Sequence, residues 1–129
     1  RQQDAIVRKI LVVDDEPENL TLIENILKDE PGYKVYKEAS GRKALKTLQS
    51  IDMDLILLDI QMPGMDGFKV YDEIRKISDV PIVFLTSDKN IDTLDKANTL
   101  SVEDYLVKPF MPQALLEILH SILQEKLEL

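Results

Sequence analysis

The stretch Ile10-Leu11-Val12-Val13-Asp14-Asp15 decides the fold, because four aliphatic residues lead directly to two carboxylates. Three further apolar runs also end at a polar side chain: Leu55-Ile56-Leu57-Leu58-Asp59, Ile82-Val83-Phe84-Leu85-Thr86 and Tyr105-Leu106-Val107-Lys108. Continuous apolar runs of this length are typical of strands buried on both faces, as in a parallel sheet between two layers of helices. In open sheets of this kind, ligands bind in the crevice outside the carboxyl ends of the strands. We therefore expect a ligand site where these runs end.

Strand-like and helix-like segments alternate five times along the chain. We predict strands at 9–14, 33–38, 54–59, 81–86 and 103–108, and helices at 17–29, 41–50, 66–78, 88–99 and 111–127. The strand at 33–38 is more polar than the others, which is typical of an edge strand. Alternation at this spacing predicts an α/β fold: a five-stranded parallel sheet with right-handed crossovers and helices on both faces.

The composition is that of one globular domain. The chain has 129 residues, of which 44% are hydrophobic and 31% are charged, and this is long enough to bury a substantial core. We interpret 1–129 as a single domain with its core at about 8–127 and an N-terminal flank at 1–7. Because the chain begins with Arg1 rather than Met, we expect it to be part of a longer protein.

Charge and residue usage argue against several classes of function. The formal net charge of −8 argues against direct nucleic-acid contact, which needs a basic face. No apolar stretch is long enough to cross a bilayer, so we expect no membrane insertion. The chain has no cysteine, which excludes disulfides and a thiol nucleophile and is compatible with a cytoplasmic location.

Three carboxylates, a lysine and a hydroxyl are expected to meet at one edge of the predicted sheet. Asp14, Asp15, Glu16 and Asp59 would repel one another without a bound cation, and Mg²⁺ prefers such oxygen ligands. Each residue taken alone also has a structural explanation. Asp14 or Asp15 could cap the next helix, whereas Lys108 could be a solvated charge and Thr86 a β-branched strand residue. Their joint occurrence favours a site for Mg²⁺ and a phosphoryl group.

The chain resembles the receiver domain of bacterial two-component response regulators over nearly its whole length. Four segments carry the resemblance, in order and at the family's spacing: Ile10-Leu11-Val12-Val13-Asp14-Asp15-Glu16-Pro17, Asp59-Ile60-Gln61-Met62-Pro63-Gly64-Met65-Asp66-Gly67, Pro81-Ile82-Val83-Phe84-Leu85-Thr86-Ser87 and Asp104-Tyr105-Leu106-Val107-Lys108-Pro109-Phe110. The resemblance implies a flavodoxin-like (βα)5 fold with strand order 2-1-3-4-5. In that order the topological switch point lies between the first and third strands, where the three carboxylates are expected.

The resemblance also implies a role for each residue of the site. Asp59 would accept a phosphoryl group from a phosphohistidine and form an aspartyl phosphate. Mg²⁺ would be held by the Asp59 carboxylate, by Asp15 directly, by Asp14 through water, and by the backbone carbonyl of Gln61. Lys108 would pair with the phosphoryl oxygens, so that catalysis consists of positioning and charge neutralisation.

Two residues would transmit the signal. By resemblance, the Thr86 hydroxyl bonds the phosphoryl group and Tyr105 swings inward as Thr86 moves, which changes the face formed by the fourth and fifth strands and helices. The peptide bond before Pro109 is expected to be cis. Ser87 departs from the family, which commonly has Ala or Gly there, so its larger side chain could narrow access to Asp59 or donate an extra hydrogen bond.

The expected partners follow from this assignment. They are a sensor histidine kinase or a His-phosphotransfer protein, a fused output domain, and a second copy of the chain bound through the apolar helix at 111–127. The domain would catalyse only its own Mg²⁺-dependent phosphorylation and dephosphorylation. The alternatives are a Mg²⁺-dependent phosphatase with an Asp nucleophile and a docking module with a structural acidic pocket. Such phosphatases carry an Asp-x-Asp motif on the first strand and a cap domain, which the adjacent Asp14-Asp15 does not match.

Overall fold

The computed structural model describes residues 7–87 and 104–127, with side chains described as far as Leu123. Nine elements lie in these ranges: β1 (Arg8–Val13), α1 (Pro17–Lys28), β2 (Tyr33–Glu38), α2 (Gly41–Ser50), β3 (Leu55–Asp59), α3 (Gly67–Arg75), β4 (Ile82–Thr86), β5 (Asp104–Val107) and α5 (Pro112–Leu127). Each agrees with a predicted strand or helix to within three residues. The helix predicted at 88–99 lies outside the described residues.

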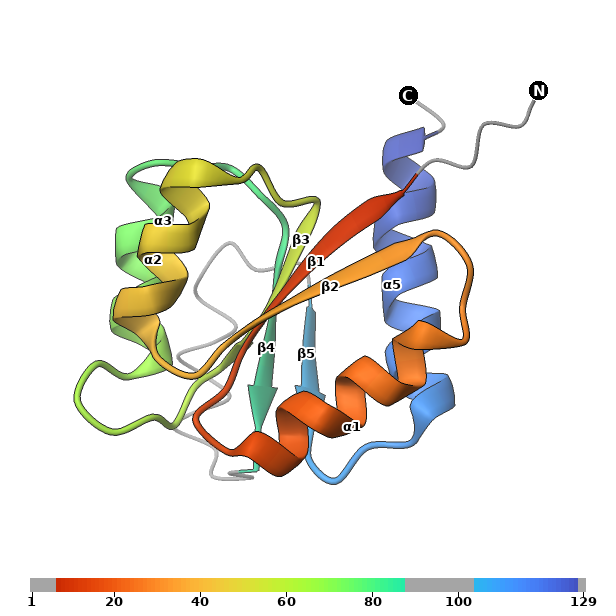
Figure 1. Cartoon of the computed structure of the whole chain (residues 1–129), viewed down its shortest axis with the longest axis horizontal. Coiled ribbons are helices and arrows are strands. Elements are labelled where there is room, and N and C mark those ends of the chain that lie inside the picture. Colours follow the sequence, from red (N-terminus) through yellow and green to blue (C-terminus); the bar gives the residue numbers. More distant parts are fainter. Residues whose placement is uncertain (1–6, 88–103, 128–129) are drawn as a thin grey trace.

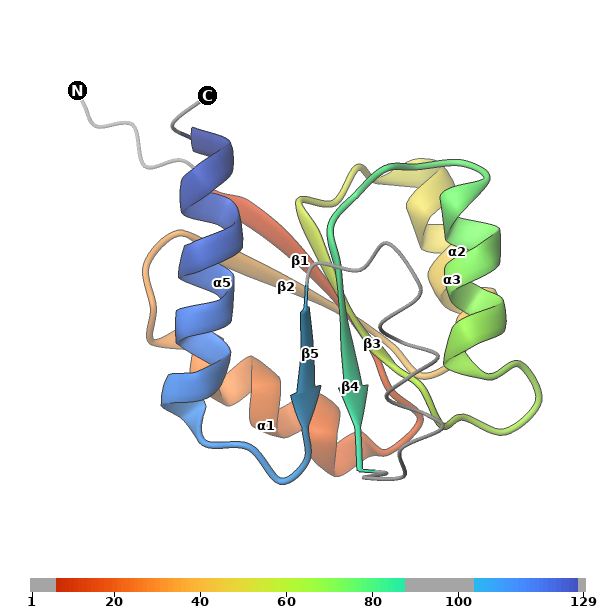
Figure 2. The same cartoon turned by 180° about the vertical axis from the view of Figure 1, so that it is seen from behind.

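The five strands form one parallel sheet in the order β2-β1-β3-β4-β5, as expected. Helices α1 and α5 cover one face, and α2 and α3 cover the other (Figures 1 and 2). This is the flavodoxin-like receiver arrangement. Strand β1 pairs with β2 on one side and with β3 on the other, so the topological switch point lies at the carboxyl end of β1.

The apolar runs form strands because both of their faces are covered. In β1, Leu11 and Val13 pack into the core beneath α2 and α3, whereas Ile10 and Val12 pack beneath α1 and α5. All five residues of β3 and all five of β4 are buried. Strand β2 has two exposed residues and no fully buried one, which confirms the predicted edge strand.

Helix α3 ends three residues earlier than predicted. The chain leaves the helix in a turn at Lys76 and Ile77, and the Arg75 guanidinium donates hydrogen bonds to the carbonyls of Ser78 and Val80 at 3.3 and 2.8 Å. These bonds satisfy carbonyls of the segment after the helix, which have no partner within the helix. The apolar spacing could not reveal this, because Ile77 continues the helical pattern although its side chain is exposed.

The apolar face of α5 is more completely covered than the sequence suggested. Of its described residues, Leu115, Leu119 and Leu123 are buried, and the others that pack on the same core are half-buried: Ala114, Leu116, Ile118 and Ile122. Neighbouring elements therefore cover the described part of the helix. Association of two copies through α5 stays a prediction. No helix in the described ranges is long and apolar enough to cross a membrane.

Gly67 lies where α3 begins against the end of β3, and we predict that no larger residue fits there. A Cβ at this position would collide with the carbonyl oxygen of Asp59 and lie 2.5 Å from the Cα of Ile60. Because these are backbone atoms, Gly67→Ala is expected to destabilise the domain by about 1–3 kcal/mol in urea unfolding. The control Lys46→Ala, on the exposed face of α2, should change stability by less than about 0.5 kcal/mol. Equal effects of the two substitutions would show that the close approach is not constraining.

Candidate functional site

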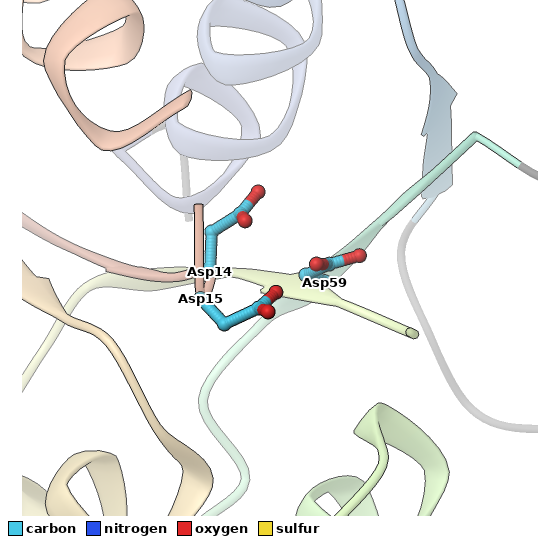
Figure 3. Close-up of side chains that lie close together, drawn as sticks. All are labelled: Asp14, Asp15 and Asp59. Carbon is cyan, nitrogen blue, oxygen red and sulfur yellow. The ribbon is translucent and has the colours of Figure 1, made fainter. Parts of the chain in front are cut away.

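The ends of β1 and β3 bring three carboxylates together. Asp14 and Asp15 follow β1, Asp59 is the last residue of β3, and their side chains lie close together (Figure 3). If one carboxylate oxygen is taken from each residue, the three oxygens all lie within 4.8 Å of one another. Asp14 is completely buried, Asp59 is 2% exposed and Asp15 is half-buried. The carboxylates predicted to share one site therefore do so.

Lys108, from the end of β5, supplies positive charge to this cluster. Its Nζ donates a hydrogen bond to Oδ2 of Asp14 at 3.0 Å and lies 3.5 Å from Oδ1 of Asp59. Burial lowers the pKa of Lys108, but the hydrogen bond that Lys108 donates to Asp14 and the charge of Asp59 outweigh burial and raise that pKa above its ordinary value. The side chain of Lys108 is only 11% exposed, so it is not the solvated charge that the alternative required.

Burial and neighbouring charge strongly affect Asp59. The pKa of Asp59 is raised from 3.8 to about 7, mainly by burial and next by the nearby charge of Asp14, although Lys108 and a hydrogen bond from the backbone N–H of Gln61 oppose the rise. That N–H donates to Oδ1 of Asp59 at 3.2 Å. A bound cation would relieve the repulsion between the carboxylates and favour the ionised form of Asp59.

Neither Asp14 nor Asp15 caps α1, so that alternative is wrong. The N-cap residue is Glu16, which makes no side-chain capping bond, and Pro17 begins the helix. Oδ1 of Asp14 instead accepts a hydrogen bond from the backbone N–H of Glu16 at 2.9 Å. This bond turns the chain sharply after β1, and so it leaves Asp14 inside the cluster and Asp15 at its edge.

The two predicted switch residues lie on the neighbouring strands. Thr86 ends β4, is fully buried, and accepts a hydrogen bond at its carbonyl from the N–H of Lys108 at 2.7 Å. Tyr105 of β5 pairs in register with Phe84 and is half-buried against the core beneath α2 and α3. The peptide bond between Lys108 and Pro109 is cis, as expected.

Two contacts at the site extend what the sequence predicted. The carboxylate of Glu16 lies 3.8 Å from Nζ of Lys108, so a fourth acid borders the cluster. The hydroxyl of Ser87 donates a hydrogen bond to Oε1 of Gln61 at 3.1 Å, which links the segments that follow β4 and β3. The sequence placed Glu16 among the acids that repel one another, but it did not pair Glu16 with Lys108. For Ser87, the sequence suggested a hydrogen bond but not its partner.

The carboxylate set fits a Mg²⁺ ion. All three groups offer oxygen donors, the type that Mg²⁺ prefers, and they come from two adjacent strand ends that can approach one ion together. The backbone at Gln61 adjoins Asp59, so its carbonyl is available as a further oxygen donor. Nitrogen and sulfur donors, which favour transition metals, are absent from the group.

A fold of this order with acids at the ends of its first and third strands defines a receiver domain. The family model of the response regulator receiver domain matches residues 10–120, and the chain belongs to this family, whose members act in two-component signalling. The chain is 42% identical to "Probable transcriptional regulator ycf27" of Cyanidium caldarium over 125 residues, which is 95% of this chain and 49% of that protein. The chain spans about half the length of the curated relatives it matches.

Two solved structures illustrate the similarity. Chemotaxis protein CheY4 of Vibrio cholerae superimposes with a TM-score of 0.83 at 33% identity, covering 90% of this chain and 98% of that one. The receiver domain of sensor histidine kinase PA1611 from Pseudomonas aeruginosa gives a TM-score of 0.81 at 34% identity, covering 90% and 97%. That structure has a magnesium ion coordinated in its active site cleft.

Proposed function

We propose that the chain accepts a phosphoryl group from a phosphohistidine onto Asp59 with the help of Mg²⁺. The observation that carries this proposal is the position of Asp59. Its carboxylate is buried at the end of β3, shares a cluster with Asp14 and Asp15, and lies 3.5 Å from Nζ of Lys108. A nucleophile, two further oxygen donors and a cation are thus assembled at one strand edge.

The transfer needs no general base. A carboxylate oxygen of Asp59 attacks the phosphorus, a P–O bond forms, the P–N bond breaks, and the electron pair leaves with the histidine. Asp14, Asp15, Asp59 and the carbonyl of Gln61 would hold Mg²⁺, which supplies charge neutralisation at the phosphoryl oxygens when bound. Lys108 would move from Asp14 toward the transferred group and balance the added negative charge.

The response would pass through the neighbouring strands. Thr86 is bonded through its carbonyl to the N–H of Lys108, and Tyr105 lies one strand away from Thr86. A shift of the Thr86 hydroxyl toward the phosphoryl group would therefore bring β4 and β5 with it. A two-state change of this face would transmit phosphorylation to an output domain or partner.

The proposed partners are a sensor histidine kinase or a His-phosphotransfer protein, in the cytoplasm. The output would belong to a part of a longer protein, since the curated relatives are about twice as long as this chain and the first of them is described as a transcriptional regulator. The acidic domain itself would not contact nucleic acid, and a second copy bound through α5 is a further possible partner of the phosphorylated form.

One experiment separates this function from its alternatives. The chain is incubated with acetyl phosphate and Mg²⁺, and phosphoprotein and free phosphate are both followed. A receiver takes up one phosphoryl group per chain, a phosphatase turns over many, and a docking module takes up none. Beryllofluoride, which imitates the phosphoryl group, should bind with Mg²⁺ to the Asp nucleophile of a receiver or of such a phosphatase, and it should not bind to a docking module.

Stability without Mg²⁺ should depend on pH through Asp59. Its pKa of about 7 in the folded chain exceeds the unfolded value of 3.8, so the folded state binds more protons between these values. The contribution of Asp59 is therefore fully present below pH 3.8 and is lost as pH rises through 7. Asp59→Asn should remove this dependence and be more stable than the natural chain at pH 8 by roughly 1–4 kcal/mol.

Urea unfolding from pH 5 to pH 8 in a chelator checks this expectation. Asp52→Asn, an exposed acid at the other end of the sheet, serves as the control and should follow the natural chain. Saturating Mg²⁺ should flatten the curve of the natural chain, because a bound cation keeps Asp59 ionised. Parallel curves for the natural chain and Asp59→Asn would contradict the assigned pKa shift.

A further inference from the structure

The side chains of Ser87 and Gln61 join two segments across the edge of the sheet. The hydroxyl of Ser87 donates to Oε1 of Gln61 at 3.1 Å, and both residues are exposed. We call this hydrogen bond the Ser87–Gln61 clasp. It connects the residue after Thr86 with the residue two places after Asp59, so its two ends belong to the strands that carry the switch hydroxyl and the phosphoacceptor.

The clasp continues the pairing of β3 and β4 beyond the backbone ladder. Asp59 is in register with Leu85, and the N–H of Ile60 donates to the carbonyl of Leu85 at 2.9 Å. After these residues the two backbones no longer pair. Gln61 is held a second time, because its N–H donates to Oδ1 of Asp59 at 3.2 Å. The backbone of one clasp residue is therefore bonded to the acceptor carboxylate.

The surroundings of the clasp bear on access to the acceptor. Asp59 is only 2% exposed, so its carboxylate offers little surface to an incoming phosphodonor. Gln61 lines a hollow of about 610 Å³ with Asp15 and Glu16, and Ser87 lines a hollow of about 220 Å³ with Glu16 and Lys108. Glu16 borders both hollows, and the clasp links a lining residue of one with a lining residue of the other.

We propose that the Ser87–Gln61 clasp restricts access to Asp59 and must open before the carboxylate can attack a phosphodonor. Ser87 and Gln61 then act as positioning residues that set the rate of phosphorylation without touching the transferred group. This inference rests on the proposed function, since it concerns the regulation of that same site. Opening the clasp breaks a single exposed hydrogen bond, so the expected effect on the rate is modest.

Ser87→Thr and Ser87→Val form the matched pair for the test. The two new side chains have nearly the same size, but only threonine keeps the hydroxyl. With acetyl phosphate as the donor, Ser87→Val should be phosphorylated about 2- to 10-fold faster than Ser87→Thr, the range expected for one hydrogen bond. The difference should appear in the second-order rate constant at low donor concentration, whereas Mg²⁺ affinity and melting temperature should be equal in the two variants.

Gln61→Met removes the acceptor from the other end of the clasp while keeping a side chain of similar length. The Gln61→Met variant should be phosphorylated faster than the natural chain. The double variant with Ser87→Val should be phosphorylated no faster than Ser87→Val alone. Such non-additivity is the signature of two residues acting through one bond. Independent, multiplying effects would overturn the proposal, as would equal rates for Ser87→Thr and Ser87→Val.

These outcomes are separate from a failure of the proposed function. If the natural chain takes up no phosphoryl group, or if Asp59→Asn takes up as much as the natural chain, phosphoacceptance at Asp59 is wrong and the clasp has no reaction to control. If the natural chain is phosphorylated at Asp59 but the matched pair does not differ, only the clasp is wrong.

Discussion

Asp59→Asn is expected to abolish incorporation of a phosphoryl group from acetyl phosphate in the presence of Mg²⁺. The amide oxygen of asparagine is a much weaker nucleophile than a carboxylate, and the product would lack the acyl phosphate bond. Labelling of the natural chain should approach one group per chain and should be lost on treatment with hydroxylamine, which cleaves acyl phosphates. Labelling of the variant should fall by at least about 100-fold, as for loss of a covalent nucleophile.

The control separates this effect from a loss of folding. Asp52→Asn makes the same chemical change at an exposed position at the opposite end of the sheet and should label like the natural chain. The fold of Asp59→Asn should persist, because the substitution removes a buried charge whose pKa is raised by burial and by Asp14. If Asp59→Asn labels at the natural rate and stoichiometry, the phosphoacceptor is another residue.

Much of the fold could be predicted because the strands have an unambiguous signature. Runs such as 10–13 and 55–58 are apolar at every position, and this pattern requires covering layers on both faces. The structure has those layers, with Ile10 facing one and Leu11 the other. The order of the strands in the sheet could not be predicted from these runs. Alternation of strands and helices predicts parallel pairing, but the order 2-1-3-4-5 came from the resemblance to receivers.

The candidate site could be predicted where it depends on strand ends. Parallel strands place their carboxyl ends at one edge, so Asp14, Asp59 and Lys108 were expected at the same edge once their runs were read as strands. Contacts between loop side chains were not accessible in the same way. The bond between Ser87 and Gln61 joins residues 26 positions apart, and no periodicity reports how two exposed side chains turn after their strands end.

Coverage of α5 shows why an apolar helix face is an ambiguous signal. Its apolar residues span more of the helix than contact with a flat sheet requires, and this predicted an exposed interface. In the structure the sheet twists and α1 lies beside α5 on the same face, so residues on the flanks, such as Leu116 and Ile122, are half-buried against the same core. How much of an apolar stripe is covered depends on neighbouring elements that the helix's own sequence does not specify.

Asp15→Ala is expected to lower the affinity for Mg²⁺ by at least about 10-fold, and Lys108→Ala is expected to leave it nearly unchanged. Asp15 contributes a carboxylate to the cluster that offers oxygen donors, and loss of even an indirect metal partner commonly has an effect of this size. Lys108 is a cation 3.0 Å from Asp14 and 3.5 Å from Asp59. Removal of Lys108 takes away a positive charge that competes with the metal, so any change in the affinity for Mg²⁺ should be an increase.

Calorimetric titration with Mg²⁺ measures both affinities, and phosphorylation at increasing Mg²⁺ concentrations tests their consequence. High Mg²⁺ should restore labelling of Asp15→Ala, because that defect lies in metal binding. It should not restore the conformational response of Lys108→Ala, followed by the NMR shifts of Thr86, because that defect lies in pairing with the phosphoryl group. Glu18→Ala removes the same charge as Asp15→Ala from an exposed position in the first turn of α1, and it should bind Mg²⁺ like the natural chain. A loss of Mg²⁺ affinity in Glu18→Ala as large as that in Asp15→Ala would mean that the ion responds to overall charge and that Asp15 is not a ligand.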